Sequence, residues 1–454
     1  MNRVAVINVV GLTKSQLGED TPRLNAFVEK CALSAFPPAF PAVTCTAQSS
    51  YVTGRSEAEH GIVGNGWYDR EAAEHKFWKQ SNHIVKGEKV WDVLRRELPG
   101  FTCAKLFWWY NMYSTADWSI TPRPMYPADG RKVFDVYTHP MGMREEIKAD
   151  LGEFPFPTFW GPMAGIPCSE WIANSARWVE DRHQPTLSLV YLPHLDYGLQ
   201  KYGPGAPEMK KELQDIDRVA GELIEYYEQR GIEVILLSEY GISKVSKPIH
   251  LNRIFREKGW IIIKDELGLE QLDCGASKAF AIADHQVAHV YLNDMSLLEE
   301  VKKTLLEVEG VEEVRMGKEL WGEGTPGAER GGDLVAVSEE NAWFTYYYWT
   351  DDAVAPDYAR CIDIHRKPGY DPVELFFDPA IKNPKVKAAK FLLKKKLGFR
   401  GLLDVIPLDA TLVKGSHGRD KVREDEMPIL ASTKHGEITK AEDVFQVILE
   451  AVRG

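Results

Sequence analysis

Residues 40–68 read FPAVTCTAQSSYVTGRSEAEHGIVGNGWY and contain the strongest functional signal in the chain. Thr44 lies in this stretch where a helix is expected to begin, so its hydroxyl would lie beside free backbone N–H groups in a field that favours anions. The segment therefore predicts a site in which the Thr44 hydroxyl meets an anionic substrate. The structural alternatives are a helix cap at Thr44 and, for Asn65 between two glycines, a simple turn residue.

Three short apolar runs, at residues 4–10, 187–192 and 234–238, have the length and composition of buried strands. Residues 212–229 repeat apolar side chains at spacings of three and four, which is typical of an amphipathic helix. Strand, helix and strand in this order predict a parallel unit. We expect an α/β fold with a mostly parallel central sheet and helices on both faces.

Polar side chains follow two of the predicted strands directly. His194 and Asp196 come after residues 187–192, and Glu239 and Tyr240 come after residues 234–238. Ligands of open α/β sheets bind beyond the carboxyl ends of the strands. We therefore expect the functional site at this edge of the sheet.

Several short motifs in residues 40–68 keep a fixed order and spacing: Phe40-Pro41, Thr44, Val52-Thr53-Gly54, His60-Gly61-Ile62 and Asn65. This pattern resembles the nucleotide pyrophosphatase/phosphodiesterase branch of the alkaline phosphatase superfamily. The resemblance implies one alkaline phosphatase-like domain over residues 1–454. It also implies that Thr44 forms a covalent phospho-enzyme and that Asn65 binds a nonbridging phosphate oxygen.

The resemblance further implies two divalent metal ions, but several of the family's ligand positions are changed here. The late Gly-x-His-Gly motif is kept as Gly415-Ser416-His417-Gly418. The other ligand positions fall on Val10, Asp196, Gln200, Glu239 and Tyr240. Val10 has no side-chain atom that could bind a metal. Gln200 and Tyr240 stand where the family has histidines. A carboxylate is kept at Asp196 and Glu239.

We therefore expect one metal ion rather than two (Mn, Mg, Fe or Zn), with Asp196, Gln200, Glu239, His417 and Thr44 as candidate ligands. A neutral amide oxygen such as that of Gln200 suits Mg²⁺, Mn²⁺ or Ca²⁺ better than Zn²⁺. A weak hydroxyl nucleophile needs a base or a metal. Glu239 is accordingly either a metal ligand or the general base, and Tyr240 can donate a hydrogen bond to the phosphate.

Other polar clusters could extend the site. His365, Arg366 and Lys367 are predicted to meet an anionic group of the substrate. A metal site could also be rebuilt from other residues, namely His194, Asp284, His285, His289 and Asp363. For each of them the alternative is a purely structural role.

Two stretches, at about residues 67–180 and 295–350, are predicted to be insertions that form a cap or lid. Both are rich in aromatic residues, for which core packing and a stacking surface for a ring are the two interpretations. The basic run at residues 385–396 has a helical pattern. It is interpreted as a solvated helix face, with a docking surface as the alternative.

The net charge of −12 argues against nonspecific binding to nucleic-acid polymers and to anionic membranes, because both use basic patches. No apolar run reaches the roughly 18 residues of a membrane span, and the N-terminal run is too short for a signal peptide. The six cysteines are spread singly, without a CxxC motif. These features predict a cytoplasmic protein; its oligomeric state cannot be read from the sequence.

Two functions are compatible with this sequence. The first is a metal-assisted hydrolase, or a phosphoryl or nucleotidyl transferase, that acts on a small phosphodiester, phosphomonoester or nucleotide-like pyrophosphate through Thr44. The second is a metal-depleted relative that binds a phosphorylated small molecule without turning it over.

Overall fold

The run at residues 4–10 forms the central strand β1 (Val4–Val9), which is buried along its whole length. It pairs in parallel with β8 (Leu187–Leu192) on one side and with β9 (Glu233–Leu237) on the other. These are the three strands that the apolar runs predict. The computed structural model describes residues 1–434, 436 and 438–454.

The main sheet has eight strands in the order β2-β20-β9-β1-β8-β5-β6-β7. Its other members are β2 (Ala32–Ala35), β5 (Cys103–Leu106), β6 (Trp118–Pro122), β7 (Val136–His139) and β20 (Ile429–Ser432). The five strands from β9 to β6 pair in parallel, whereas β20, β2 and β7 are antiparallel to their neighbours. The predicted mostly parallel sheet is confirmed.

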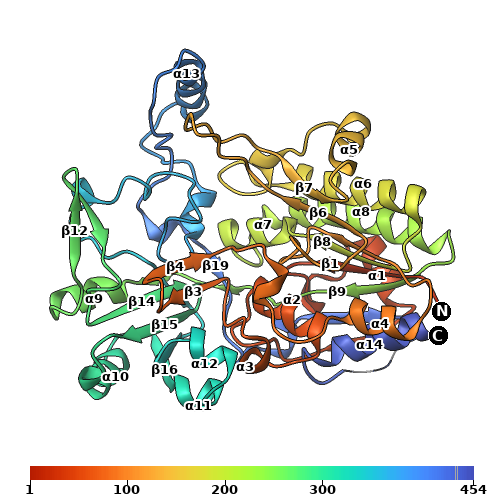
Figure 1. Cartoon of the computed structure of the whole chain (residues 1–454), viewed down its shortest axis with the longest axis horizontal. Coiled ribbons are helices and arrows are strands. Elements are labelled where there is room, and N and C mark those ends of the chain that lie inside the picture. Colours follow the sequence, from red (N-terminus) through yellow and green to blue (C-terminus); the bar gives the residue numbers. More distant parts are fainter. Residues whose placement is uncertain (435, 437) are drawn as a thin grey trace.

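Helices cover both faces of this sheet (Figure 1). Alternate residues of β1 belong to two separate cores: Ala5, Ile7 and Val9 face one, and Val4 and Val6 face the other. The first core includes α1 (Pro22–Val28), α6 (Ile166–His183), α7 (His194–Tyr202) and α8 (Met209–Glu228). The second includes α2 (Thr44–Thr53), α4 (Val90–Glu97) and α14 (Asp443–Arg453).

A second, antiparallel sheet of four strands lies beside the first (Figure 1). Its order is β14 (Ala279–Asp284), β15 (Val287–Leu292), β17 (Leu334–Ser338) and β16 (Val311–Met316). The aromatic residues Tyr346 to Trp349 are buried in a third core against this sheet. Burial assigns these rings to packing and leaves no face free to stack on a ligand.

Residues 67–180, for which the sequence predicts a cap, contribute β5, β6 and β7 to the main sheet. These strands have four or five residues and include Lys105 and Ser119. Both side chains are buried by tertiary contacts. Strands this short and polar do not show the continuous apolar pattern that marks β1, β8 and β9.

The remaining strands form small sheets around the two larger ones. They are β3 (Gly66–Asp69), β4 (Glu74–Phe77), β10 (Ser243–Lys244), β11 (Lys247–Ile249), β12 (Ile263–Glu266), β13 (Leu269–Leu272), β18 (Ala342–Phe344) and β19 (Gly415–Ser416). The remaining α-helices are α3 (Glu57–His60), α5 (Met143–Leu151), α9 (Leu251–Glu257), α10 (Leu298–Leu306), α11 (Gly317–Trp321), α12 (Pro326–Arg330) and α13 (Pro384–Lys396).

Candidate active site

The carboxyl ends of β9, β1 and β8 lie side by side and bring the predicted polar residues together. Glu239 and Tyr240 follow β9 directly, and Asp196 lies in the first turn of α7, just after β8. Thr44 is the first residue of α2, where the sequence predicts a helix start. All four residues are buried.

A chain of hydrogen bonds joins Thr44 to Asp196. The hydroxyl oxygens of Thr44 and Tyr240 lie 3.0 Å apart, and the Tyr240 hydroxyl donates to Asp196 Oδ1 at 3.2 Å. Burial raises the pKa of Asp196 to about 7, against hydrogen bonds from Gln200 and Tyr240 that act in the opposite direction. A carboxyl group with this pKa can take up a proton near neutral pH.

Gln200 uses both ends of its amide within the protein. Its Nε2 donates to Asp196 Oδ2 at 2.7 Å, and its Oε1 accepts from the Tyr370 hydroxyl at 3.0 Å. Gln200 therefore positions the Asp196 carboxyl group and ties it to Tyr370, which lies 170 residues further along the chain.

Four aromatic rings form a continuous stack in the same region, in the order Tyr240, His417, His285 and Tyr370. Adjacent ring centroids are 3.7 Å apart throughout, and the Tyr240 and His417 planes differ by 8°. Burial lowers the pKa of both histidines well below the ordinary value, so both rings are neutral at pH 7. His417 Nδ1 then donates to the Ala42 carbonyl oxygen at 2.6 Å.

Asn65 lies against the first turn of α2. Its Oδ1 accepts from the Cys45 backbone N–H at 3.1 Å, and its Nδ2 donates to Asp284 Oδ1 at 3.1 Å. Asp284 also lies 2.7 Å from His285 Nδ1, which connects Asn65 to the ring stack. Asn65 is thus next to Thr44 and is more than a residue of the Gly64–Gly66 turn.

Glu239 is held by one residue of β1 and one of α2. Its Oε1 accepts from Asn8 Nδ2 and from Gln48 Nε2, both at 2.6 Å. Burial raises the pKa of Glu239 to about 8, and hydrogen bonds from Gln48, Thr44 and Asn8 oppose that shift. The side chain is therefore largely protonated at pH 7, when it is a poor general base.

This raised pKa makes stability depend on pH. Glu239 holds its proton in the folded state up to about pH 8, but an unfolded chain releases it near 4.5. Its contribution to stability is therefore complete below pH 4.5 and is lost as the pH rises through 8. The slope between these values is about 1.4 kcal/mol per pH unit. In Glu239→Gln this slope disappears, while the amide oxygen still accepts from Asn8 and Gln48.

The measurement is urea unfolding of both proteins across this pH range in buffer with EDTA. The free-energy difference between wild type and Glu239→Gln is expected to change steadily with pH, in favour of the variant at high pH. The exposed substitution Glu208→Gln is the control and is expected to leave the slope unchanged. A difference that is constant with pH would show that Glu239 titrates normally.

The two-metal centre that the resemblance implies does not fit these residues. Val10 offers no donor, Tyr240 lies flat on His417, and Glu239 Oε1 is held by two amides. Across the part of the chain that the structure describes, no three His, Cys, Asp or Glu side chains are grouped to hold a metal ion. For the single predicted metal, Asp196 and His417 remain as candidate ligands beside Gln200 and Thr44, and His417 Nε2 lies 3.6 Å from Asp196 Oδ1.

The predicted cluster of His365, Arg366 and Lys367 does not assemble on Thr44. Lys367 is buried, with ion pairs to Asp371 at 2.7 Å and to Glu374 at 2.6 Å. Arg366 is exposed and forms an ion pair with Asp357 at 2.8 Å. His365 Nδ1 lies 3.1 Å from the Phe77 carbonyl oxygen. Three consecutive residues thus make three separate sets of contacts.

Of the other candidate metal ligands, some make structural contacts and some lie in the site. His194 pairs with Glu212 at 3.0 Å, and His289 bonds to the backbone of Val63 and Gly332, so both have structural partners. Asp284 and His285 do enter the site. The sequence interpretation missed Asn8, Gln48 and Tyr370, because an isolated polar residue on a strand, helix or loop has no pattern of its own.

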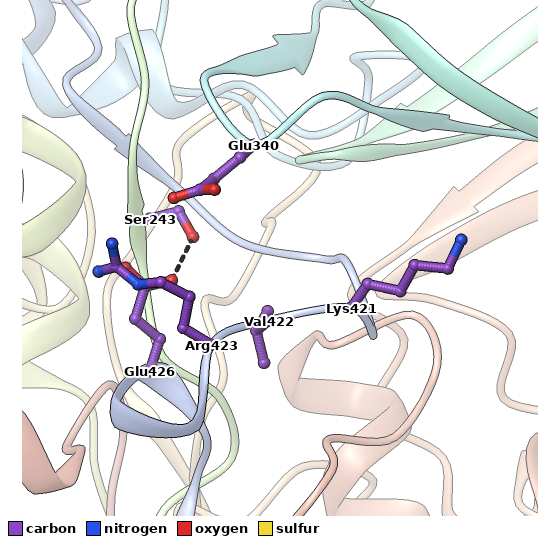
Figure 2. Close-up of a pocket in the computed structure, with 6 residues that line it drawn as sticks. All are labelled: Ser243, Glu340, Lys421, Val422, Arg423 and Glu426. Atoms are coloured by element: carbon purple, nitrogen blue, oxygen red, sulfur yellow. Dashed lines mark hydrogen bonds and ion pairs between the residues drawn. The ribbon is translucent and has the colours of Figure 1, made fainter.

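A separate cavity of about 280 Å³ contains none of the predicted site residues. Figure 2 shows its lining, which is Ser243, Glu340, Lys421, Val422, Arg423 and Glu426. Ser243 donates to Glu426, which also pairs with Arg423 at 2.7 Å. These polar groups satisfy one another, so the cavity does not rival the Thr44 region as the reactive centre.

A family model and the related sequences all point to the same protein family. The family model described as type I phosphodiesterase / nucleotide pyrophosphatase matches residues 4–371. The chain is 27% identical over 255 residues to an uncharacterized pyrophosphatase/phosphodiesterase of Schizosaccharomyces pombe. This match covers 54% of this chain and 45% of the yeast protein. It is 24% identical over 227 residues to ectonucleotide pyrophosphatase/phosphodiesterase family member 1 of Mus musculus, covering 48% of this chain and 21% of that protein.

The fold also has solved neighbours. Murine ectonucleotide pyrophosphatase/phosphodiesterase 5, in an inactive form in complex with AMP, superposes with a TM-score of 0.59 at 14% identity. That comparison covers 100% of this chain and 95% of the other. The human protein of the same name gives a TM-score of 0.58. The sequence matches, by contrast, span less than half the length of the curated relatives.

Proposed function

The chain belongs to the type I phosphodiesterase / nucleotide pyrophosphatase family, and from that premise we propose that it cleaves a phosphodiester or pyrophosphate bond with Thr44 as the nucleophile. The observation that carries the proposal is the hydrogen-bonded chain from Thr44 through Tyr240 to Asp196 at the start of α2. A nucleotide-like substrate is favoured because the murine structural neighbour is described in complex with AMP.

In the proposed reaction the Thr44 oxygen bonds to phosphorus as its proton passes to Tyr240, whose own proton passes to Asp196. The bond from phosphorus to the leaving oxygen breaks, and its electron pair departs with the leaving group. Water then hydrolyses the phosphothreonine and restores the Thr44 hydroxyl. The free N–H groups and the dipole at the α2 N-terminus stabilise the phosphate charge. These steps are carried by the chain's own residues, and none of them is routed through a metal ion.

The proposal is tested with bis-p-nitrophenyl phosphate and a nucleotide pyrophosphate, first in buffer with EDTA and then with Mn²⁺, Mg²⁺, Fe²⁺ or Zn²⁺ added. Turnover is expected in EDTA. Turnover that appears only with a metal ion would overturn the proton path through Tyr240. Absence of turnover under every condition would overturn the hydrolase function itself.

Tyr240→Phe is the informative variant, because it keeps the ring stack on His417 but removes the hydroxyl. We expect kcat to fall by about 10²–10⁴-fold with little change in KM, which is the usual contribution of a group that transfers protons. Tyr291→Phe is the control, because it removes a buried hydroxyl that donates to the Arg330 carbonyl oxygen and to none of the site residues. Equal losses in the two variants would mean that the effect of Tyr240→Phe does not come from proton transfer through its hydroxyl.

A second function, binding of a phosphorylated small molecule without turnover, is favoured by one specific observation. Thr44 is only 3% exposed, and the neutral ring stack fills the place where the family's metal ligands are expected. Titration calorimetry with AMP separates the two functions. Measurable binding to a protein that shows no turnover in the assays above would support this second function over hydrolysis.

A further inference from the structure

Helix α13 and its flanks have a charge opposite to that of the chain as a whole. Residues 379–403 contain seven lysines, one arginine and no acidic residue, whereas the chain has a net charge of −12. In Figure 1, α13 lies at the top of the view, set apart from the two sheets. No residue of α13 is buried.

One face of α13 is held by its own loop. Lys387 Nζ pairs with Asp404 Oδ2 at 2.8 Å and donates to the Asp404 carbonyl oxygen at 2.6 Å. Phe391 is half-buried on the same face, near Gly401. The helix orientation is therefore fixed, and its opposite face is directed to solvent.

That outward face is apolar along its centre. Val386, Ala389, Leu393 and Leu397 recur at the three- and four-residue spacing of a single helix face. The three larger side chains among them are 50%, 60% and 67% exposed. Lys385, Lys390 and Lys396 flank this stripe, and the turn that follows adds Phe399, which is 64% exposed. We call this stripe with its flanking lysines the α13 surface.

The hairpin between β6 and β7 approaches the other face of α13, because Asp129 near its tip interacts electrostatically with Lys395, which lies on the half-buried side of the helix with Phe391. Met125, Tyr126 and Phe134 of this hairpin are 40%, 55% and 46% exposed. A second element close to α13 thus also has exposed apolar side chains. Exposed apolar patches of this kind mark interaction sites.

We propose that the α13 surface docks on an anionic lipid bilayer, with its stripe of apolar side chains in the headgroup region and its lysines on lipid phosphates and carboxylates. Lysine stems reach along apolar surface and keep their ammonium groups at the interface. In the part of the chain that the structure describes, no helix is long and apolar enough to cross a membrane. Docking is therefore peripheral, with α13 parallel to the surface.

The composition of the surface favours a bilayer over a nucleic acid. A polynucleotide would be bound by the cations alone and would leave exposed leucines without a partner, whereas a bilayer takes up both. The cations are almost all lysines, which act as point charges rather than as planar forks that pair with two phosphate oxygens. A mixed patch of leucine and lysine has its complement in acyl chains and anionic headgroups.

The test is cosedimentation of the full chain with vesicles of phosphatidylcholine alone or of phosphatidylcholine mixed with phosphatidylserine. Binding is expected only to the mixed vesicles and is expected to weaken with salt. In K385Q/K390Q/K396Q, affinity is expected to fall about a hundredfold, since each lysine near an anionic surface contributes about fivefold. In L393N/L397N, binding is expected to be lost although every charge remains.

The matched control is K210Q/K211Q/K303Q, which removes three exposed lysines from α8 and α10 and is expected to leave vesicle binding unchanged. Thermal unfolding checks that all variants remain folded. The proposal is overturned if wild type binds both vesicles equally or neither, or if the control loses as much affinity as the α13 variants. Tighter binding to random-sequence RNA than to mixed vesicles at equal salt would assign the surface to nucleic acid instead.

Discussion

Thr44→Ala is expected to reduce phosphodiester turnover by at least about a thousandfold, to the background of the assay. Removing the nucleophile of a covalent mechanism removes the step on which the other groups act, so the loss approaches that of the whole catalytic set. The fold is expected to survive, because the change deletes one hydroxyl and one methyl group at the first residue of α2. Initial rates with bis-p-nitrophenyl phosphate measure the effect.

Thr46→Ala is the matched control for this variant. Thr46 is also buried on α2, and its hydroxyl has no hydrogen-bond partner within the described residues. We expect its turnover to stay close to wild type. An acid-quenched reaction should also yield a phosphorylated or nucleotidylated peptide that contains Thr44, seen by mass spectrometry. Full turnover in Thr44→Ala, or label on another residue, would refute the nucleophile assignment.

Lys367→Met is expected to lower the free energy of unfolding by about 3–5 kcal/mol. The Lys367 side chain is 1% exposed, and its ammonium group pairs with the buried carboxylates of Asp371 and Glu374. Burial opposes the charged lysine, but the two carboxylates outweigh it and raise the pKa of Lys367. Without the lysine, two buried negative charges remain close together with no counter-ion, which is the costly outcome.

Arg366→Met is the natural control, because this neighbouring cation is exposed and pairs at the surface with Asp357. Exposed pairs contribute about 0–1 kcal/mol, so little destabilisation is expected. Urea unfolding of the two variants gives the comparison. If Lys367→Met proved as stable as Arg366→Met and instead raised KM for a phosphate ester, the sequence prediction of a substrate contact at Lys367 would be restored.

Much of the fold could be predicted because its signals are local. The runs that become β1, β8 and β9 are fully buried strands with continuous apolar sequence, and the predicted helix at residues 212–229 corresponds to α8 (Met209–Glu228). Strands β5 to β7 were not predicted from the sequence, because they are short and lack a continuous apolar pattern. Their burial comes from their neighbours in the sheet.

The sequence by itself determined the family segment around Thr44 and Asn65 and the loss of metal donors at Val10 and Tyr240, since both depend only on which residue stands at each position. The tertiary structure alone decided what replaced those donors. Tyr240, His417, His285 and Tyr370 come from four distant segments, and their stack exists only once the strand ends and loops converge. Contacts between residues this far apart have no periodicity in the sequence, so only the folded chain reveals them.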